Sequence, residues 1–270
     1  MALATAAQRL AAVTPTPRLD AELLMAHALG TTRNTLLLSR LDDPTPDTFA
    51  PLIERRLQHE PVAYITGTRD FWTIDLAVAP GVLIPRPDSE TLIEAAVEHF
   101  AGTAGPRSVL DLGTGSGALL LAALDQWPDA KGIGVDASAD AIEIARANAE
   151  RLGMAARAEI VAGDWTGRGG PHDLILCNPP YIGTAEPLPY EVRDWEPASA
   201  LFAGNDGLDD YRVIAAVLRP QLSPGGVACI EIGSTQDAAV FALFSTQGFT
   251  VSLRHDLAGH PRCLALTLPA

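Results

Sequence analysis

The sequence has few cysteines and no long apolar run, and each shortage excludes a class of protein. Cys177, Cys229 and Cys263 are its three cysteines, and they stand far apart without a CxxC pair or histidine ligand spacing. They therefore predict buried, reduced thiols and no metal site or disulfide framework. The apolar runs fall well short of the ~18 residues of a membrane-spanning helix, and no charged-then-apolar leader opens the chain. We expect a cytoplasmic protein without a membrane partner.

Basic residues are also scarce, and acidic residues are unevenly placed. The chain holds 19 Lys and Arg against 33 Asp and Glu, a net charge of −14. Because nucleic-acid binding depends on neutralising phosphates with basic side chains, we expect no direct nucleic-acid partner. Residues 1–80 contain seven basic and nine acidic residues, which leaves twelve and twenty-four for residues 81–270. The chain therefore has two electrostatically different parts.

The first part, residues 1–63, has helical periodicity. The apolar residues of 19–28 recur at helical spacing and end at Gly30, and residues 35–41 and 49–57 are shorter helical segments between proline-rich breaks. This pattern predicts a bundle of four or five helices, for which two roles stay open: a packing cap and a substrate-docking domain. Residues 64–78 change to a β-type pattern, which predicts a hairpin linker over 64–80.

The second part, residues 81–270, alternates strands and helices. We expect an α/β domain with a mostly parallel sheet and helices on both faces, because strand, helix and strand follow one another from about Pro106. The expected strands are 108–112, 131–135, 158–161, 173–177, 226–232, 250–253 and 263–268, and the expected helices are 118–124, 139–151, 208–218 and 236–244.

A glycine-rich turn after the first of these strands predicts a nucleoside cofactor. Gly113, Gly115 and Gly117 allow a sharp turn close to a ligand, and Asp136 ends the next strand, where its carboxylate can accept ribose hydroxyls. The GxGxG spacing, with Thr114 inside it, differs from the GxGxxG of dinucleotide-binding proteins. The preceding Asp111 would repel a pyrophosphate but suits a cationic sulfonium or an amino group. The motif therefore favours S-adenosylmethionine (SAM) over NAD, and a turn needed only for packing remains an alternative.

Two residues after the third strand fit the same cofactor. Asp164 offers a carboxylate to an adenine amino group, and the indole of Trp165 can cover the ring. A second interpretation of Asp164 is that it only stabilises a turn or caps a helix.

The segment Asn178-Pro179-Pro180-Tyr181 directly follows a buried strand, at the sheet edge where open α/β sheets bind ligands. The Asn178 side-chain oxygen and the Pro179 carbonyl can accept both hydrogens of a planar NH2 group, while Tyr181 packs on its plane and Pro180 stiffens the loop. Such a group is an amide or aromatic amine, whose nitrogen is poorly nucleophilic. Holding it in line with a sulfonium methyl would promote methyl transfer without a strong base. A proline turn that merely ends a strand is the alternative.

These motifs together resemble a known family. Residues 111–117 with 178–181 are similar to class I SAM-dependent methyltransferases that act on amide or exocyclic amino nitrogens. More narrowly, the segment 82–90, which reads VLIPRPDSE, resembles the signature of the HemK/PrmC family, the N5-glutamine methyltransferases of peptide chain release factors. Residues 19–30, 61–67, 71–72, 196–197 and 200–214 agree with the same family, so the resemblance spans nearly the whole chain.

The resemblance implies a fold, a reaction and roles for residues. The fold would be a Rossmann-like, seven-stranded methyltransferase domain joined by a β-hairpin to a helical bundle. Asn178 and the Pro179 carbonyl would hold the glutamine of the Gly-Gly-Gln motif of class 1 release factors, SAM would become S-adenosylhomocysteine, and Arg86 would lie beside the substrate. Glu196 to Ala200 would form a buried loop that braces the Asn178 turn. For Asp88, capping of the following helix is an alternative to a substrate role.

Other functions remain for comparison. A DNA adenine-N6 methyltransferase shares the NPPY chemistry but needs a basic recognition face. A factor that binds release factors without catalysis is a second alternative, and a lysine methyltransferase is a third, although an ammonium substrate must first lose a proton. We expect a monomer, whose acidic second part would attract a basic release factor.

Overall fold

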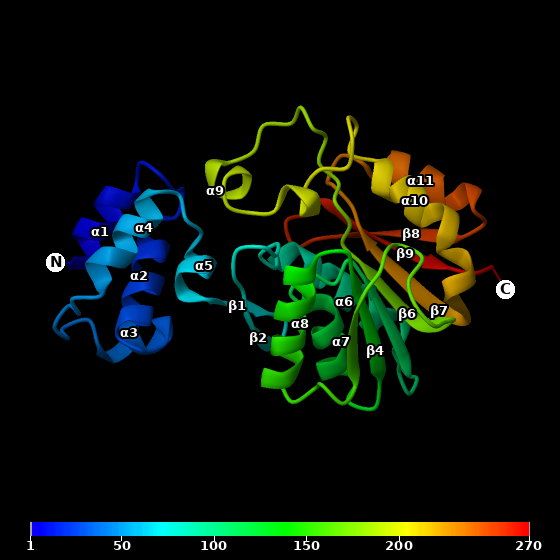
Figure 1. Ribbon diagram of the computed structural model, residues 1–270, viewed down its shortest axis with the longest axis horizontal. Coiled ribbons are helices and arrows are strands. Elements are labelled where there is room, and N and C mark those ends of the chain that lie inside the picture. Colours follow the sequence, from blue (N-terminus) through cyan, green and yellow to red (C-terminus); the bar gives the residue numbers. More distant parts are fainter. Residues whose placement is uncertain (1, 270) are drawn as a thin grey trace. The chain divides into compact units, whose positions relative to one another are not determined.

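The computed structural model describes residues 2–269, which form two compact units (Figure 1). The helical unit contains the residues up to Thr68 together with Leu188–Trp195, and the sheet unit contains Arg69–Pro187 and the residues from Glu196 onward. Within residues 2–269, no helix is long and apolar enough to cross a membrane.

Six helices make up the described part of the helical unit: α1 Ala2–Leu10, α2 Pro17–Ala28, α3 Arg33–Ser39, α4 Phe49–Leu57, α5 Val62–Thr66 and α9 Tyr190–Arg193. Leu10, Leu24, Leu36 and Ile53 fill its core. The expected β pattern of residues 64–66 is wrong, because these residues close helix α5. Pro61 precedes that helix, and Gly67, with a φ of 76°, ends it, so local turn chemistry outweighs the β-type side chains.

Helix α9 comes from a distant part of the sequence and is held by a buried arginine. Arg56 is 3% exposed; its Nε donates to Asp20 at 2.8 Å and its Nη2 donates to Glu191 of α9 at 2.7 Å. The indole of Trp195 donates to the Gln58 carbonyl at 3.3 Å. Residues 188–195 are thus part of the helical unit, which the sequence did not indicate.

The sheet unit contains a small hairpin and a seven-stranded sheet. The hairpin pairs β1 Thr68–Phe71 with β2 Ile74–Ala77. The large sheet has the order β5-β4-β3-β6-β7-β9-β8, in which β9 runs opposite to the other six strands. Its strands are β3 Ser108–Leu112, β4 Lys131–Asp136, β5 Ala158–Ala162, β6 His172–Cys177, β7 Leu222–Glu231, β8 Thr250–His255 and β9 Pro261–Thr267. The central strands are nearly continuous apolar runs, and their successive side chains pack alternately into the cores on the two faces.

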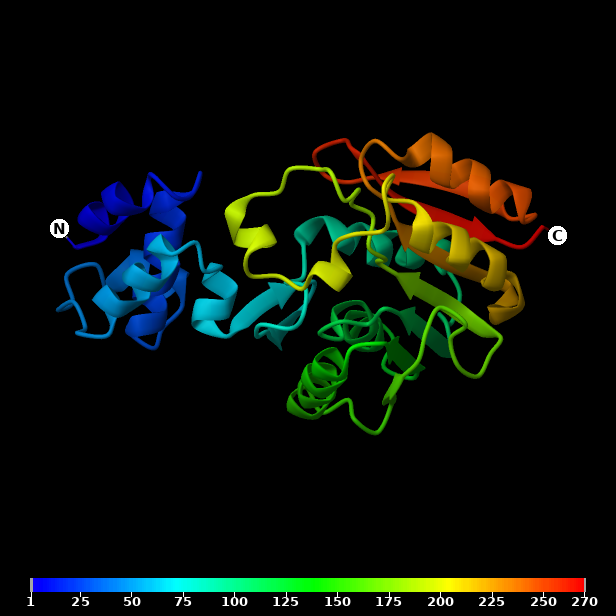
Figure 2. The same cartoon turned by 45° about the horizontal axis from the view of Figure 1, so that its top comes forward.

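Helices cover both faces of this sheet (Figure 2). Helices α6, α7 and α8 share one core with the hairpin, and α10 and α11 share the core of the opposite face. Their bounds are α6 Glu90–His99, α7 Ala118–Gln126, α8 Ala139–Arg151, α10 Asp209–Val217 and α11 Asp237–Thr246, with short 3-10 turns η1 Pro87–Ser89, η2 Ala198–Ala200 and η3 Arg219–Gln221. The expected mostly parallel seven-stranded α/β fold is confirmed.

The sheet order determines where a ligand can bind. The chain moves outward from β3 to β5 on one side and then returns to place β6 on the other side of β3. At this reversal, the loops after β3 and β6 leave the same edge in opposite directions, which opens a crevice. Gly113 and Asn178, which follow these two strands, therefore face one site.

Candidate active site

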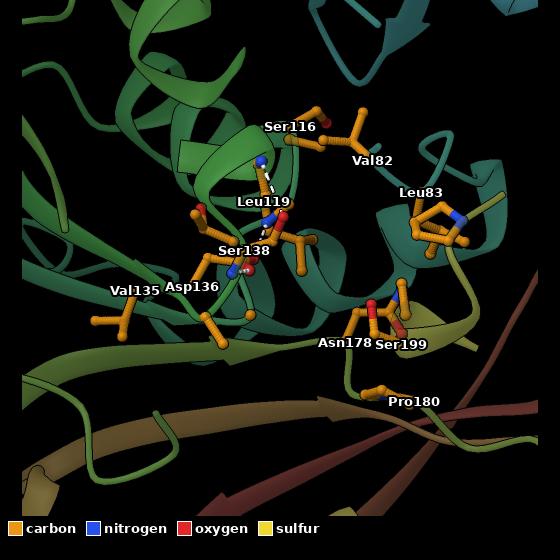
Figure 3. Close-up of a pocket in the computed structure, with 18 of the residues that line it drawn as sticks. Val82, Leu83, Ser116, Leu119, Val135, Asp136, Ser138, Asn178, Pro180 and Ser199 are labelled. Carbon is orange, nitrogen blue, oxygen red and sulfur yellow. Dashed lines mark hydrogen bonds between the residues drawn. The ribbon is translucent and has the colours of Figure 1, made fainter. Parts of the chain in front are cut away.

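A cavity of about 340 Å³ lies at this edge, within the sheet unit (Figure 3). Asp136 and Ser138 line one side, and Asn178, Pro180 and Ser199 line another. Of the residues selected from the sequence, the following line the cavity: Arg86, Gly113, Thr114, Gly115, Asp136, Asp164, Trp165, Asn178 and Pro180. Asp111, Gly117, Pro179 and Tyr181 are not part of this lining.

The glycine turn approaches the cavity closely because two backbone amides fix it to the next strand. The N–H groups of Gly113 and Thr114 both donate to the Val135 carbonyl, at 2.9 and 3.0 Å. Gly113 has a φ of 71°, and a Cβ there would lie 3.2 Å from the ring of Trp165. A side chain at this position would therefore strain the backbone and crowd the indole.

Asp111 is fully buried and holds the turn in place through hydrogen bonds. Its Oδ2 accepts from the Thr114 hydroxyl at 2.6 Å and from the Leu120 amide at 3.2 Å, while its Oδ1 has no hydrogen-bond partner among residues 2–269. Complete burial raises the pKa of Asp111 to about 7. The carboxylate thus supports the turn through Thr114.

Asp136 holds the glycine turn with one carboxylate oxygen and the start of α8 with the other. Oδ2 accepts from the Gly115 amide at 2.8 Å, and Oδ1 accepts from the Ser138 amide at 2.9 Å. Each oxygen retains a further lone pair, so the carboxylate can also accept a ligand hydroxyl.

Trp165 and Asp164 differ in how firmly they are held. The Trp165 indole donates to Asp210 at 2.9 Å, so the ring is oriented beside Gly113. Asp164 accepts from both the amide and the hydroxyl of Thr166, and the hydroxyl contact lowers its pKa. Asp164 therefore stabilises a local turn, which was one of the two interpretations of this residue. It also lies on the cavity lining, so the second interpretation, a contact with the ligand, is compatible with its position.

The carboxamide of Asn178 is anchored by its nitrogen. Its Nδ2 donates to the Ser89 hydroxyl at 3.2 Å. With the amide nitrogen assigned to this contact, Oδ1 is the atom available to accept a hydrogen bond from a ligand. Tyr181 turns its hydroxyl to Glu231, at 3.3 Å, and Gln236 donates to the Tyr181 carbonyl at 2.9 Å. The side chain and the backbone of Tyr181 are thus both hydrogen-bonded by residues outside the cavity lining.

The Pro-Arg-Pro-Asp segment is held by ion pairs. Arg86 lines the cavity and donates to Glu196 at 2.5 Å, and the same buried carboxylate accepts from the Ile84 amide at 3.1 Å. Asp88 pairs with Arg262 at 3.3 Å, and no side-chain hydrogen bond caps α6. The capping interpretation of Asp88 is therefore wrong.

The expected buried loop over residues 196–200 is correct only at Glu196. Ala198 and Ser199 are exposed, because the short turn η2 leaves the sheet there. The brace on the Asn178 loop lies further along: the Ile182 amide donates to the Leu201 carbonyl at 2.9 Å, and the Ala203 amide donates to the Ile182 carbonyl at 3.0 Å. This pairing stabilises the chain just after Tyr181.

Sequence reasoning missed four polar residues around the site: Ser89 as the partner of Asn178, Asp210, Glu231 and Gln236. Ser89 carried a signal only as part of the 82–90 segment that resembles the family signature. The others come from distant helices and strands, so their contacts follow from the fold. The described residues contain no group of three or more metal-ligating side chains.

Comparisons with known proteins agree with this geometry. Two family models match the chain: the PrmC N-terminal domain over residues 1–67 and the methyltransferase small domain over residues 88–187. A solved methyltransferase from Pyrococcus furiosus has a TM-score of 0.55 at 19% identity, over 72% of this chain and 87% of that one, which supports the fold. The fold and the site define a class I methyltransferase.

Sequence relatives narrow the class. The release factor glutamine methyltransferase of Rhodospirillum rubrum is 43% identical over 92% of this chain and 78% of its own length, and that of Caulobacter vibrioides is 42% identical over 91% and 88%. The chain belongs to the release factor glutamine methyltransferase family.

Proposed function

We propose that this protein transfers a methyl group from SAM to the side-chain amide nitrogen of the glutamine in the Gly-Gly-Gln motif of class 1 release factors, and so supports translation termination. The observation that carries the proposal is Asn178: its amide nitrogen is anchored on Ser89, and its side chain lines the same cavity as the glycine turn and Asp136. The names of the relatives support the same substrate class.

The residues on the glycine side of the cavity fit SAM. Gly113 and Gly115 present backbone without side chains, Asp136 has free lone pairs for ribose hydroxyls, and Trp165 offers an oriented flat surface for adenine. When bound, SAM supplies the methyl group on a positively charged sulfur, which keeps the bonding electron pair and leaves as S-adenosylhomocysteine.

The residues on the Asn178 side fit a glutamine amide. In this proposal Asn178 Oδ1, on the cavity lining, accepts one of its N–H hydrogens, and the carbonyl of Pro179, which lies just outside that lining, accepts the other. The two contacts draw the nitrogen lone pair out of conjugation and orient it. The nitrogen bonds to the methyl carbon and then loses one proton, giving neutral N5-methylglutamine. The proton leaves easily, because an N-protonated amide is a strong acid, so no dedicated base is required.

The cofactor assignment predicts that Asp136→Ala weakens SAM binding. We expect the dissociation constant, measured by calorimetry, to rise about 10- to 100-fold, because hydrogen bonds to a charged group contribute ~1.5–3 kcal/mol. Asp129→Asn is the matched control, since Asp129 is exposed and precedes the opposite end of β4. Unchanged affinity in Asp136→Ala would place the ribose elsewhere.

The function itself is tested by mass spectrometry. Purified class 1 release factor, incubated with the protein and SAM, should gain one methyl group on its Gly-Gly-Gln peptide. Plasmid DNA in a parallel reaction should gain none. No methylated glutamine would reject the proposal, and methylated adenine would favour the DNA methyltransferase instead.

The charge distribution predicts how the substrate arrives. Residues 81–270 carry most of the net charge of −14, and release factors need basic surface to work on ribosomal RNA. We therefore propose that the acidic domain attracts release factors electrostatically and that residues 1–63 dock them. We further propose that the enzyme acts as a monomer in the cytoplasm. At subsaturating release factor, the methylation rate should fall between low and physiological salt. A salt-independent rate would reject this electrostatic attraction but not the chemistry.

A further inference from the structure

Glu231, the last residue of β7, is a buried carboxylate that the proposed chemistry does not use. It is 1% exposed and lies at the carboxyl edge of the sheet, where the cavity opens. Its Oε1 accepts from the Tyr181 hydroxyl at 3.3 Å, while Oε2 has no partner within hydrogen-bond distance in the described part of the chain. A buried carboxylate oxygen without a full partner is destabilising, so its presence beside this loop calls for an explanation.

The surroundings of Glu231 connect it to Asn178 as well. The Ser89 hydroxyl lies near the Glu231 carboxylate, where it favours the charged form, and it accepts from the Nδ2 of Asn178 at 3.2 Å. Because a hydroxyl has a single proton, a negative charge on Glu231 favours turning that proton toward the carboxylate, which leaves the hydroxyl lone pairs for Asn178. Ser89 therefore stands between Glu231 and Asn178.

We propose that Glu231 is a positioning residue for methyl transfer, which holds Tyr181 directly and Asn178 through Ser89, so that the Asn178 carboxamide oxygen faces the glutamine amide. This inference rests on the proposed function. Without the carboxylate, the Ser89 proton is free to turn toward Asn178, and the carboxamide can then rotate its NH2 group into the cavity. An NH2 group there would oppose the N–H hydrogens of the substrate.

The charge on Glu231 depends on several groups. Burial and Asp88 raise its pKa to about 7, against the opposing effects of Ser89, Arg262 and Tyr181. The negative charge of Glu231 also helps to raise the pKa of titratable groups on the other elements packed against it: Cys177 of β6, Tyr211 of α10 and Cys263 of β9. Below pH 7 the protonated carboxyl no longer directs Ser89, so kcat should fall as the pH decreases through about 7.

The test compares Glu231→Gln with the wild type in release factor methylation. We expect kcat to fall about 10- to 100-fold, as for misplacement of a reacting group, with no change in the dissociation constant of S-adenosylhomocysteine. The acidic limb of the pH profile should disappear in the variant. Asp173→Asn is the matched control, because that carboxylate accepts two backbone amides at the opposite end of β6 and should leave kcat unchanged.

Ser89 gives a second, milder route to the same answer if Glu231→Gln fails to fold. Ser89→Ala should lower kcat to a similar extent, Ser89→Thr should retain activity, and the double variant of Ser89→Ala with Glu231→Gln should lose little more than either single variant. These results would support a shared path to Asn178.

The outcomes separate the two proposals. If the wild type methylates glutamine and Glu231→Gln keeps both the wild-type kcat and the wild-type pH profile, the positioning role is rejected and the function stands. Full activity of Ser89→Ala likewise rejects it. If the wild type itself methylates no glutamine, the proposed function fails and this inference fails with it.

Discussion

Asn178→Ala should reduce methylation of the release factor glutamine by about 100- to 1000-fold in kcat. The estimate follows from removal of one group that stabilises developing charge at a preorganised site. The variant loses the Asn178 carboxamide oxygen. In the 178–181 segment, Asn178 is the residue whose side chain both lines the cavity and is held in place by a hydrogen bond from its amide nitrogen. The measurement is multiple-turnover methylation at saturating SAM and release factor, read by mass spectrometry of the Gly-Gly-Gln peptide.

Binding measurements show whether Asn178→Ala impairs the methyl-transfer step or the binding of SAM. Calorimetry should show little change in SAM affinity, because Asp136 lies on the other side of the cavity and the substitution leaves the backbone of the glycine turn unchanged. Asn205→Ala is the matched control: Asn205 is exposed and belongs to the turn that follows η2. If Asn178→Ala kept full methylation activity, Asn178 would not bind the substrate amide as proposed. If the variant kept its full biological effect without methylation, a factor that only binds release factors would be favoured.

Arg56→Ala should destabilise the helical unit by roughly 3–5 kcal/mol. Arg56 is 3% exposed and its partner Asp20 is 5% exposed, so the substitution leaves a buried carboxylate without its cation. It also releases Glu191, and with it the ion pair that holds α9 to α4. Hydrogen exchange in peptides from α2 and α4 measures the free energy of opening in the full chain.

The exposed ion pair between Arg9 and Glu54 provides the control. Its side chains are 45% and 60% exposed at a separation of 2.7 Å, so Arg9→Ala should change stability by less than ~1 kcal/mol. Replacing both buried partners, with Arg56→Met and Asp20→Leu, should recover much of the loss, because no buried charge is then left unpaired. Glu191 also loses its cation, but its side chain is 38% exposed and stays solvated. Equal exchange in Arg56→Ala and the wild type would contradict this account.

Local patterns were sufficient for most of the elements. The strand Ser108–Leu112 and the helices Phe49–Leu57 and Ala139–Arg151 have the expected ends, because apolar periodicity, turn glycines and capping residues such as Ser138 act within a few positions. The β pattern over 64–66 failed because three β-type side chains in a row do not determine conformation when a flanking proline and glycine favour one helical turn.

The sequence by itself determined the class of site. Gly113, Asp136 and Asn178 each follow a strand, and parallel strands must bring such residues to one edge of the sheet. Only the tertiary structure decided how these residues are held: Ser89 on Asn178, Glu231 on Tyr181, Asp210 on Trp165, and a helix at 190–193 within the helical unit. The physical reason is distance along the chain, because partners 45 to 135 residues apart leave no periodic or local signal and meet only when the strands and helices pack.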